Sequence, residues 1–95
     1  MPASRLVFRR HAVQRMFQRQ ISAADVHDVL LKGDVIEDYP HDTPYPSRLV
    51  LGFAGSRPIH VVAADNLQDQ ETIVITVYEP DPALWDATFR KRKSP

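Results

Sequence analysis

Three side chains that could bind an anion lie four residues apart near the start of the chain: His11, Arg15 and Arg19. On a helix they would form one ridge, because a step of four residues adds only about 40° to a full turn. No acidic residue precedes Asp25 to offset their mutual repulsion. A phosphate held across the ridge would do so, since arginine presents a planar fork of donors and histidine can transfer a proton. The spacing predicts a phosphate-binding ridge, with His11 and Arg15 as catalytic residues and Arg19 as a nucleic-acid contact.

Cleavage of RNA is a reaction that such residues could carry out without a cofactor. Attack by the neighbouring 2′-hydroxyl needs a base, an acid and cations that stabilise the pentacoordinate phosphate. His60, inside a predicted strand, is a further catalytic candidate for proton transfer. Two alternatives remain open. Arg15 and Arg19 could pair with acidic residues from the middle of the chain, and His60 could be a hydrogen-bonded core residue.

Further contacts to nucleic acid are predicted from cations and aromatic rings elsewhere in the chain. Tyr78 could stack on a base or donate to a phosphate. Arg48 opens a predicted strand, and Arg90 and Arg92 belong to the basic run at residues 90–93. The alternative for that run is a solvated tail.

The distribution of charge and the residue types limit the kinds of site. The formal net charge is zero, yet residues 1–20 hold five arginines and no acid, and all twelve acidic residues lie between Asp25 and Asp86. Such a dipolar chain can attract a polyanion to its basic ends. The chain has no cysteine and its four histidines lack metal-ligand spacing, so we expect no metal and no cofactor. No apolar run is long enough for a signal peptide or a membrane span, and we expect a cytoplasmic protein.

Two helices are predicted in the N-terminal third of the chain. The first covers residues 10–18, and its apolar stripe consists of Ala12, Val13, Met16 and Phe17. The second begins after Ser22 as N-cap, has Asp25 near its positive end and ends at Gly33.

Four strands and a short helix are predicted to follow. The strands cover residues 35–39, 48–53, 59–64 and 72–78. Three prolines make residues 40–46 a loop, and residues 54–58 form a hairpin connection. Asp81 can cap a last helix that Pro82 opens, and three apolar residues would pack that helix onto the sheet: Leu84, Trp85 and Phe89.

This order of elements predicts a single α+β domain spanning residues 1–95. Two N-terminal helices would pack on one face of a small, mainly antiparallel four-stranded sheet, with the short helix at the C-terminus. Alternation along the last strand points Ile73, Ile75 and Val77 toward the helices. Three other residues of that strand would line the opposite, more open face together with His60: Thr72, Thr76 and Tyr78.

The run at residues 11–22 resembles the opening of a widespread bacterial domain-of-unknown-function family. Members typically begin His-x-x-x-Arg-Met-x-x-Arg-x-Ile, and residues 44–48, 60–62 and 76–80 also look like that family. The family is grouped with the RelE and BrnT type of toxin, which are small α+β ribonucleases that need no metal and are held inactive by an antitoxin. The resemblance implies a site on the open sheet face, with the matching positions His11, Arg15, Arg19, His60 and Tyr78.

Two further functions remain open from the sequence. The same fold could serve as a non-catalytic module that binds RNA or a protein partner. It could also form a homodimer through the edge strand that an open sheet leaves exposed.

Overall fold

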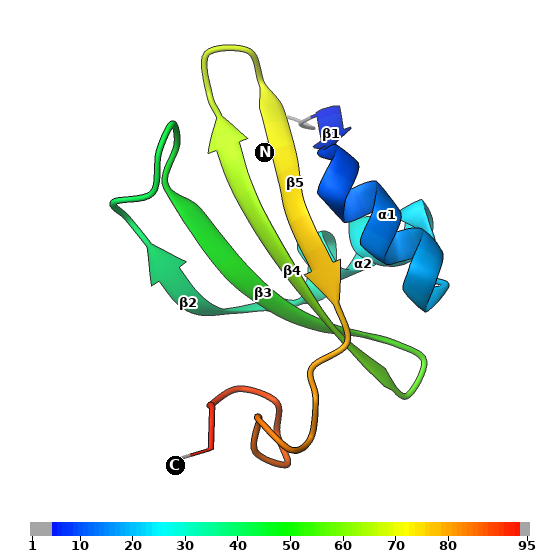
Figure 1. The fold of residues 1–95 in the computed structure, drawn as a ribbon. Coiled ribbons are helices and arrows are strands. Elements are labelled where there is room, and N and C mark those ends of the chain that lie inside the picture. The colour runs from blue at the N-terminus through cyan, green and yellow to red at the C-terminus, as the bar shows by residue number, and fades with distance from the viewer. Residues whose placement is uncertain (1–4, 94–95) are drawn as a thin grey trace.

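Residues 5–93, which the computed structural model describes, fold into two helices and a five-stranded sheet (Figure 1). In chain order the elements are β1 (Arg5–Phe8), α1 (Arg10–Arg19), α2 (Ala23–Lys32), β2 (Asp34–Tyr39), β3 (Ser47–Ala54), β4 (Arg57–Asn66) and β5 (Glu71–Tyr78). The strand order across the sheet is β1-β5-β4-β3-β2. β1 runs parallel to β5, and all other neighbours are antiparallel. Both helices lie on one side of the sheet (Figure 1).

The predicted four-stranded sheet is wrong, because the strand β1 was missed. Its parallel ladder with β5 is extended at both ends by backbone hydrogen bonds, from Arg5 N to the Gln70 carbonyl (3.1 Å) and from Arg9 N to the Val74 carbonyl (3.0 Å). A strand of four residues has almost no periodicity to recognise. Its partner lies at the far end of the sequence, so the fifth strand arises from a non-local contact.

The predicted C-terminal helix is also wrong, since the described chain after β5 forms turns, bends and an isolated antiparallel bridge between Trp85 and Arg92. Asp81 does cap locally: its carboxylate accepts from Ala83 N (2.8 Å) and its carbonyl accepts from Trp85 N (3.0 Å). The turn does not continue into a helix. The carboxylate of Asp86 instead accepts from Thr88 N (3.0 Å), and Asp86 N donates to the Lys91 carbonyl (2.9 Å), which folds the chain back.

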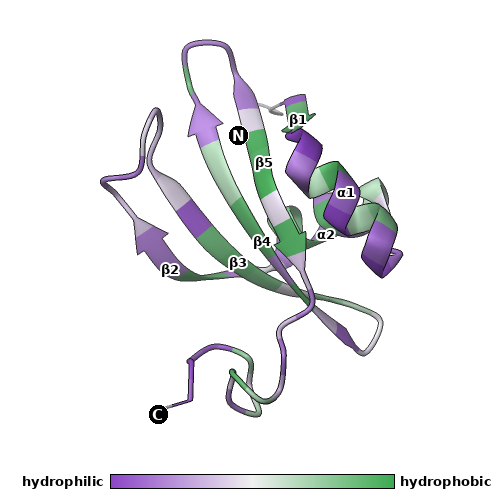
Figure 2. Cartoon of the chain, in the orientation of Figure 1, coloured by the Kyte–Doolittle hydropathy of each residue, from purple (hydrophilic) through white to green (hydrophobic). Residues whose placement is uncertain are grey.

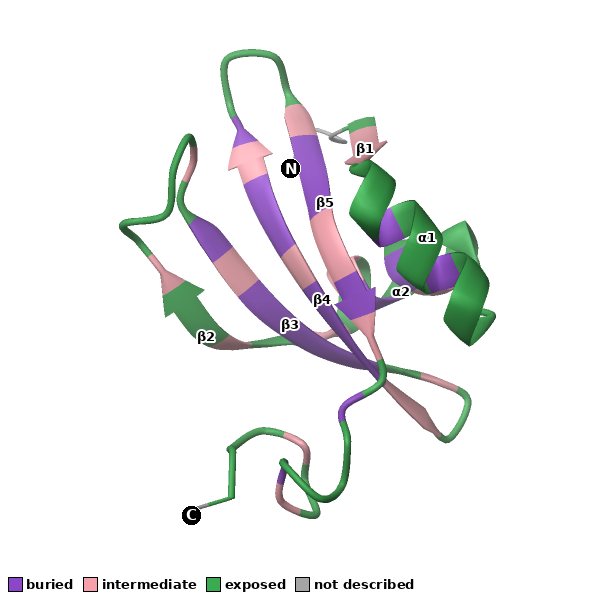
Figure 3. Ribbon diagram, in the orientation of Figure 1, coloured by how far each residue is buried: buried purple, intermediate pink, exposed green. Residues whose placement is uncertain are grey.

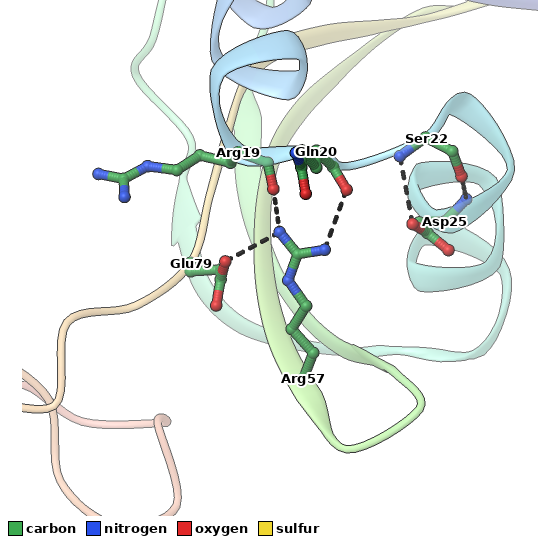
Figure 4. A network of polar contacts seen from close by, with 6 residues as sticks. All are labelled: Arg19, Gln20, Ser22, Asp25, Arg57 and Glu79. Atoms are coloured by element: carbon green, nitrogen blue, oxygen red, sulfur yellow. Dashed lines mark hydrogen bonds and ion pairs between the residues drawn. The ribbon is translucent and has the colours of Figure 1, made fainter.

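The two predicted helices are confirmed, with α1 one residue longer than expected. α2 begins with a capping box, in which Ser22 Oγ accepts from Asp25 N (3.0 Å) and the Asp25 carboxylate accepts from Ser22 N (3.2 Å), as Figure 4 shows. Gly33 ends α2 in an extended conformation with φ −76°. This position requires glycine for a steric reason, because a Cβ there would clash with the carbonyl oxygens of Val29 and Leu51.

The main core lies between the helices and the central strands, which are apolar (Figure 2) and largely buried (Figure 3). Its members are Ala12, Met16, Ile21, Val26, Val29, Val50, Ile59, Val61, Ala63, Val74 and Val77. Tight contact is possible because Gly52 on β3 faces α2, where a Cβ would come within 2.8 Å of a Val29 methyl carbon.

A bulge in the β4–β5 ladder overturns part of the predicted alternation. The register shifts between Val62 and Ala63, so that Val77 pairs with Val61 while Val74 pairs with Ala63. An inserted residue reverses the face of every residue beyond it. Val77 faces the helices as predicted, but Val74 takes the place expected for Ile73 and Ile75.

The same shift moves Thr72 off the open face. It pairs with Asp65 in the ladder, and its hydroxyl donates to the carboxylate of Asp65 (2.9 Å). Tyr78 lies beyond the bulge and pairs with His60, so these two residues share the face away from the helices, as predicted.

Candidate functional site

The sheet face opposite the helices is partly covered by residues 79–93, which we call the strap. Trp85 of the strap is only 5% exposed and lies edge-on to His60, with ring centroids 4.5 Å apart at 89°. Arg90, further along the strap, forms an ion pair with Asp34 at the start of β2. The strap therefore passes from the end of β5 to the opposite edge of the sheet, and it is drawn in orange and red in Figure 1.

His60 is fully buried beneath the strap, and both of its ring nitrogens have partners. Nε2 lies 2.8 Å from the Phe89 carbonyl oxygen, and Nδ1 lies 3.1 Å from the Tyr78 hydroxyl. Burial lowers the pKa of His60, and the hydrogen bond to the Phe89 carbonyl opposes that effect in part. At neutral pH the ring is therefore uncharged, and it is enclosed rather than open to a substrate.

A groove of about 420 Å³ lies between the strap and β2, and we call it the strap groove. Its polar and aromatic lining consists of Glu37, Tyr39, Tyr78, Trp85, Arg90, Lys91 and Arg92. Leu49 and Ile36 complete its apolar floor. Three cations, two tyrosines and a carboxylate thus face one shared space.

The charged groups of the strap groove act on both tyrosine hydroxyls. Burial and then the Glu37 carboxylate raise the pKa of Tyr39, while Arg92 opposes them. Burial and then Tyr39 raise the pKa of Tyr78, and Arg92 again opposes the shift. Both hydroxyls therefore keep their protons at neutral pH and remain able to donate or accept hydrogen bonds. Arg92 also lies over Trp85, with its guanidinium carbon 5.3 Å from the ring centroid, a cation–π distance.

The predicted ridge of His11, Arg15 and Arg19 lies on the exposed surface of α1, on the other side of the sheet from His60. Within residues 5–93 none of the three side chains forms a hydrogen bond or an ion pair, so the alternative of pairing with acids is not observed. The structure does not bring His11 or Arg15 together with His60. It does bring His60 and Tyr78 together with two other predicted residues, Arg90 and Arg92.

Arg48 lies apart from both groups. It pairs with Ala63 in the β3–β4 ladder and so faces the helix side of the sheet, where its guanidinium contacts the Asp65 carboxylate at 3.0 Å. Its charge is matched there by an acid.

A polar network that the sequence did not indicate links the strap to α1 (Figure 4). The Arg57 guanidinium donates to the carbonyls of Arg19 and of Gln20 (3.0 Å) and contacts the Glu79 carboxylate at 2.9 Å. A cation here satisfies carbonyls that the end of α1 leaves free. The Arg19 side chain extends away from this network (Figure 4).

Sequence reasoning also missed Glu37, Tyr39 and Lys91 as groove residues. A usable signal existed for two of them, since residues 37 and 39 share one face of a strand by alternation. The packing of Trp85 onto the sheet was predicted and is confirmed, although it occurs without a helix. Leu84, expected to pack beside it, is 51% exposed.

Within residues 5–93, no three His, Cys, Asp or Glu side chains gather as a metal site would require. No helix in that part of the chain is long and apolar enough to cross a membrane.

Together these features define a small α+β domain with helices on one sheet face and a cation-bearing strap on the other. The chain belongs to the family described as Domain of unknown function (DUF4258), whose model matches residues 8–79. Membership of a domain-of-unknown-function family, as predicted, is thereby confirmed, whereas the helix motif and the grouping with RelE and BrnT toxins stay predictions. No curated protein and no solved structure matches the chain. The family match ends at Glu79, so Trp85 and the strap cations lie beyond the matched residues.

Proposed function

We propose that the strap groove binds single-stranded RNA. The observation that carries this proposal is the gathering of Arg90, Lys91 and Arg92 around two half-buried tyrosines, Tyr39 and Tyr78. Proteins that bind single strands combine cations for the backbone with aromatic rings for the bases. The groove has room for an unstacked base and its phosphate, but a duplex would not enter it.

The available charge within the groove supports binding through Lys91 and Arg92 in particular. Arg90 is already paired with Asp34, whereas within residues 5–93 neither Lys91 nor Arg92 forms an ion pair. Both are exposed and line the groove. A phosphate there would meet two cations without first displacing a carboxylate.

The direct test measures binding of a fluorescently labelled, mixed-sequence RNA 12-mer at several salt concentrations. The informative variant is Lys91→Gln, and Arg15→Gln is its matched control, since it removes the same charge from the other side of the sheet. Loss of one phosphate contact should lower the slope of log K against log salt by about 0.7. We expect that loss in Lys91→Gln alone. Equal binding by the wild type and Lys91→Gln, or a loss confined to Arg15→Gln, would contradict the proposal.

Metal-independent cleavage of the bound RNA is a second candidate function, favoured by the Glu37 carboxylate in the same groove. Glu37 would take the proton of the 2′-hydroxyl, the O2′–P bond would form, and the bond from phosphorus to the 5′-oxygen would break as a solvent water protonates that oxygen. The proton held by Glu37 would then neutralise the hydroxide that is left. Lys91 and Arg92 would stabilise the charge on the phosphate. This assignment replaces His11 and His60 as the groups that move protons.

Cleavage is tested with the same RNA in the presence of a chelator. Removal of a general base should slow the reaction on the order of 100- to 10,000-fold in Glu37→Gln. His11→Ala, on the far side of the sheet, should keep the wild-type rate. Wild-type protein that binds the RNA but leaves it intact would reject cleavage and leave the binding proposal standing.

A further inference from the structure

The direction of the hydrogen bonds around His60 can be deduced from its partners. The Phe89 carbonyl oxygen can only accept, so Nε2, 2.8 Å away, carries the ring hydrogen. A neutral ring then has a lone pair on Nδ1. The Tyr78 hydroxyl, 3.1 Å from Nδ1, must therefore donate to it. The strap thus determines, through His60, where the hydroxyl hydrogen of Tyr78 points.

Apart from the hydrogen bond to the Phe89 carbonyl, no contact found for His60 among the described residues favours the charged form of the ring. Its contacts include the rings of Tyr78 and Trp85 and the carbonyl of Phe89, and it pairs with Leu51 in the ladder. No carboxylate forms a hydrogen bond with His60 within residues 5–93. Burial of the ring also favours its neutral form over its charged form.

The consequence for the strap groove is that the Tyr78 oxygen offers only lone pairs to a ligand. We propose, on the basis of the proposed RNA binding, that Tyr78 is a specificity-determining acceptor that selects a base bearing an amino group, with His60 as its positioning residue. A phosphate oxygen cannot occupy this position favourably, because two acceptors would face each other. We therefore expect the phosphate to bind Lys91 and Arg92, and the amino group on the base edge to donate to the Tyr78 oxygen.

Tyr39 provides an internal comparison in the same groove. Its hydroxyl forms no hydrogen bond within residues 5–93, whereas that of Tyr78 is held by His60. A free hydroxyl can rotate to donate or to accept, so it does not discriminate between ligands. Only the fixed hydroxyl of Tyr78 distinguishes a donor from an acceptor.

The test compares two mononucleotides that differ by one amino group: adenosine 5′-monophosphate and purine riboside 5′-monophosphate. Binding is followed by the fluorescence of Trp85, the only tryptophan in the chain, which lines the groove. One hydrogen bond between neutral groups should raise the affinity of the wild type for the adenosine nucleotide about 2- to 12-fold over its affinity for the purine riboside nucleotide. Tyr78→Phe should abolish the preference, and Tyr39→Phe should retain it.

A second measurement tests the positioning role of His60 without any variant. In ¹⁵N-labelled protein at pH 7, the ring nitrogens should report a hydrogen on Nε2 and none on Nδ1. A charged ring or the opposite tautomer would overturn the proposal, as would equal affinity of the wild type for both mononucleotides. Failure of RNA itself to bind would instead reject the proposed function on which this inference depends.

Discussion

Acid should destabilise this protein through His60. Burial lowers the pKa of His60 in the folded state, while the unfolded chain keeps an ordinary value of about 6.5. As the pH falls through that value, the unfolded state takes up a proton that the folded state does not bind. The free energy of unfolding therefore decreases with falling pH, and the decrease stops only below the folded-state pKa.

The size of this effect follows from the structure around the ring. His60 is fully buried and its two hydrogen bonds suit the neutral ring. Between the pKa of the folded state and that of the unfolded state, the unfolded chain therefore binds one proton more than the folded protein. One proton corresponds to a slope of at most about 1.4 kcal/mol per pH unit. For a domain of this size the total free energy of unfolding is about 5–15 kcal/mol, so a loss of this order per pH unit is measurable.

The assay is urea unfolding, followed by circular dichroism at pH 7.5, 6.5 and 5.5. The control is His60→Gln, because glutamine can accept from Tyr78 and donate to the Phe89 carbonyl but cannot titrate. The wild type should lose stability relative to His60→Gln between pH 6.5 and 5.5. A constant difference between the two proteins over this interval would refute the reasoning, since it would mean that His60 binds its proton equally well in both states.

Three further predictions concern stability at neutral pH. Trp85→Ala should cost about 3–5 kcal/mol of unfolding free energy, because it removes the buried ring that holds the strap on the sheet. Arg57→Ala should cost about 1 kcal/mol through the loss of its contacts to the end of α1, whereas Arg15→Ala should stay within about 0.5 kcal/mol. Gly33→Ala should cost about 1–3 kcal/mol, because its new methyl group meets two backbone carbonyls. Urea unfolding measures all of these changes, and equal stability of Arg57→Ala and Arg15→Ala would contradict the capping role.

The parts of the fold that the sequence predicted correctly depend on local signals. The capping box of α2 requires only Ser22 and Asp25, three residues apart, and both helices began where these local patterns placed them. The hairpin between β3 and β4 was predicted as well, although its turn is tighter than expected, since Ala54 already pairs with Arg57. Gly55 permits that turn with a φ of +65°.

The parts that were missed depend on contacts between distant segments. β1 pairs with β5 through a contact between segments that are far apart in the sequence. The four residues of β1 carry no periodic pattern that would predict this pairing. The bulge after Val62 is set by how β5 fits against β4, and strict alternation cannot foresee it. The candidate site shows the same division, since Tyr78 and Arg92 were identified by residue type, while their meeting in the strap groove depends on the path of the chain after β5.

The absence of net charge constrains how this protein could recognise RNA. A formal charge of zero provides little long-range attraction for a polyanion, so affinity must come from contacts inside the groove. With Arg90 paired to Asp34, Lys91 and Arg92 remain for phosphates, which predicts a salt slope of only about −1.4 for a single strand. With so weak a salt dependence, most of the binding free energy must come from stacking and hydrogen bonds, and both of these depend on the identity of the base. A fixed acceptor at Tyr78 is therefore most useful in a neutral protein, because there a single hydrogen bond is a large share of the binding free energy.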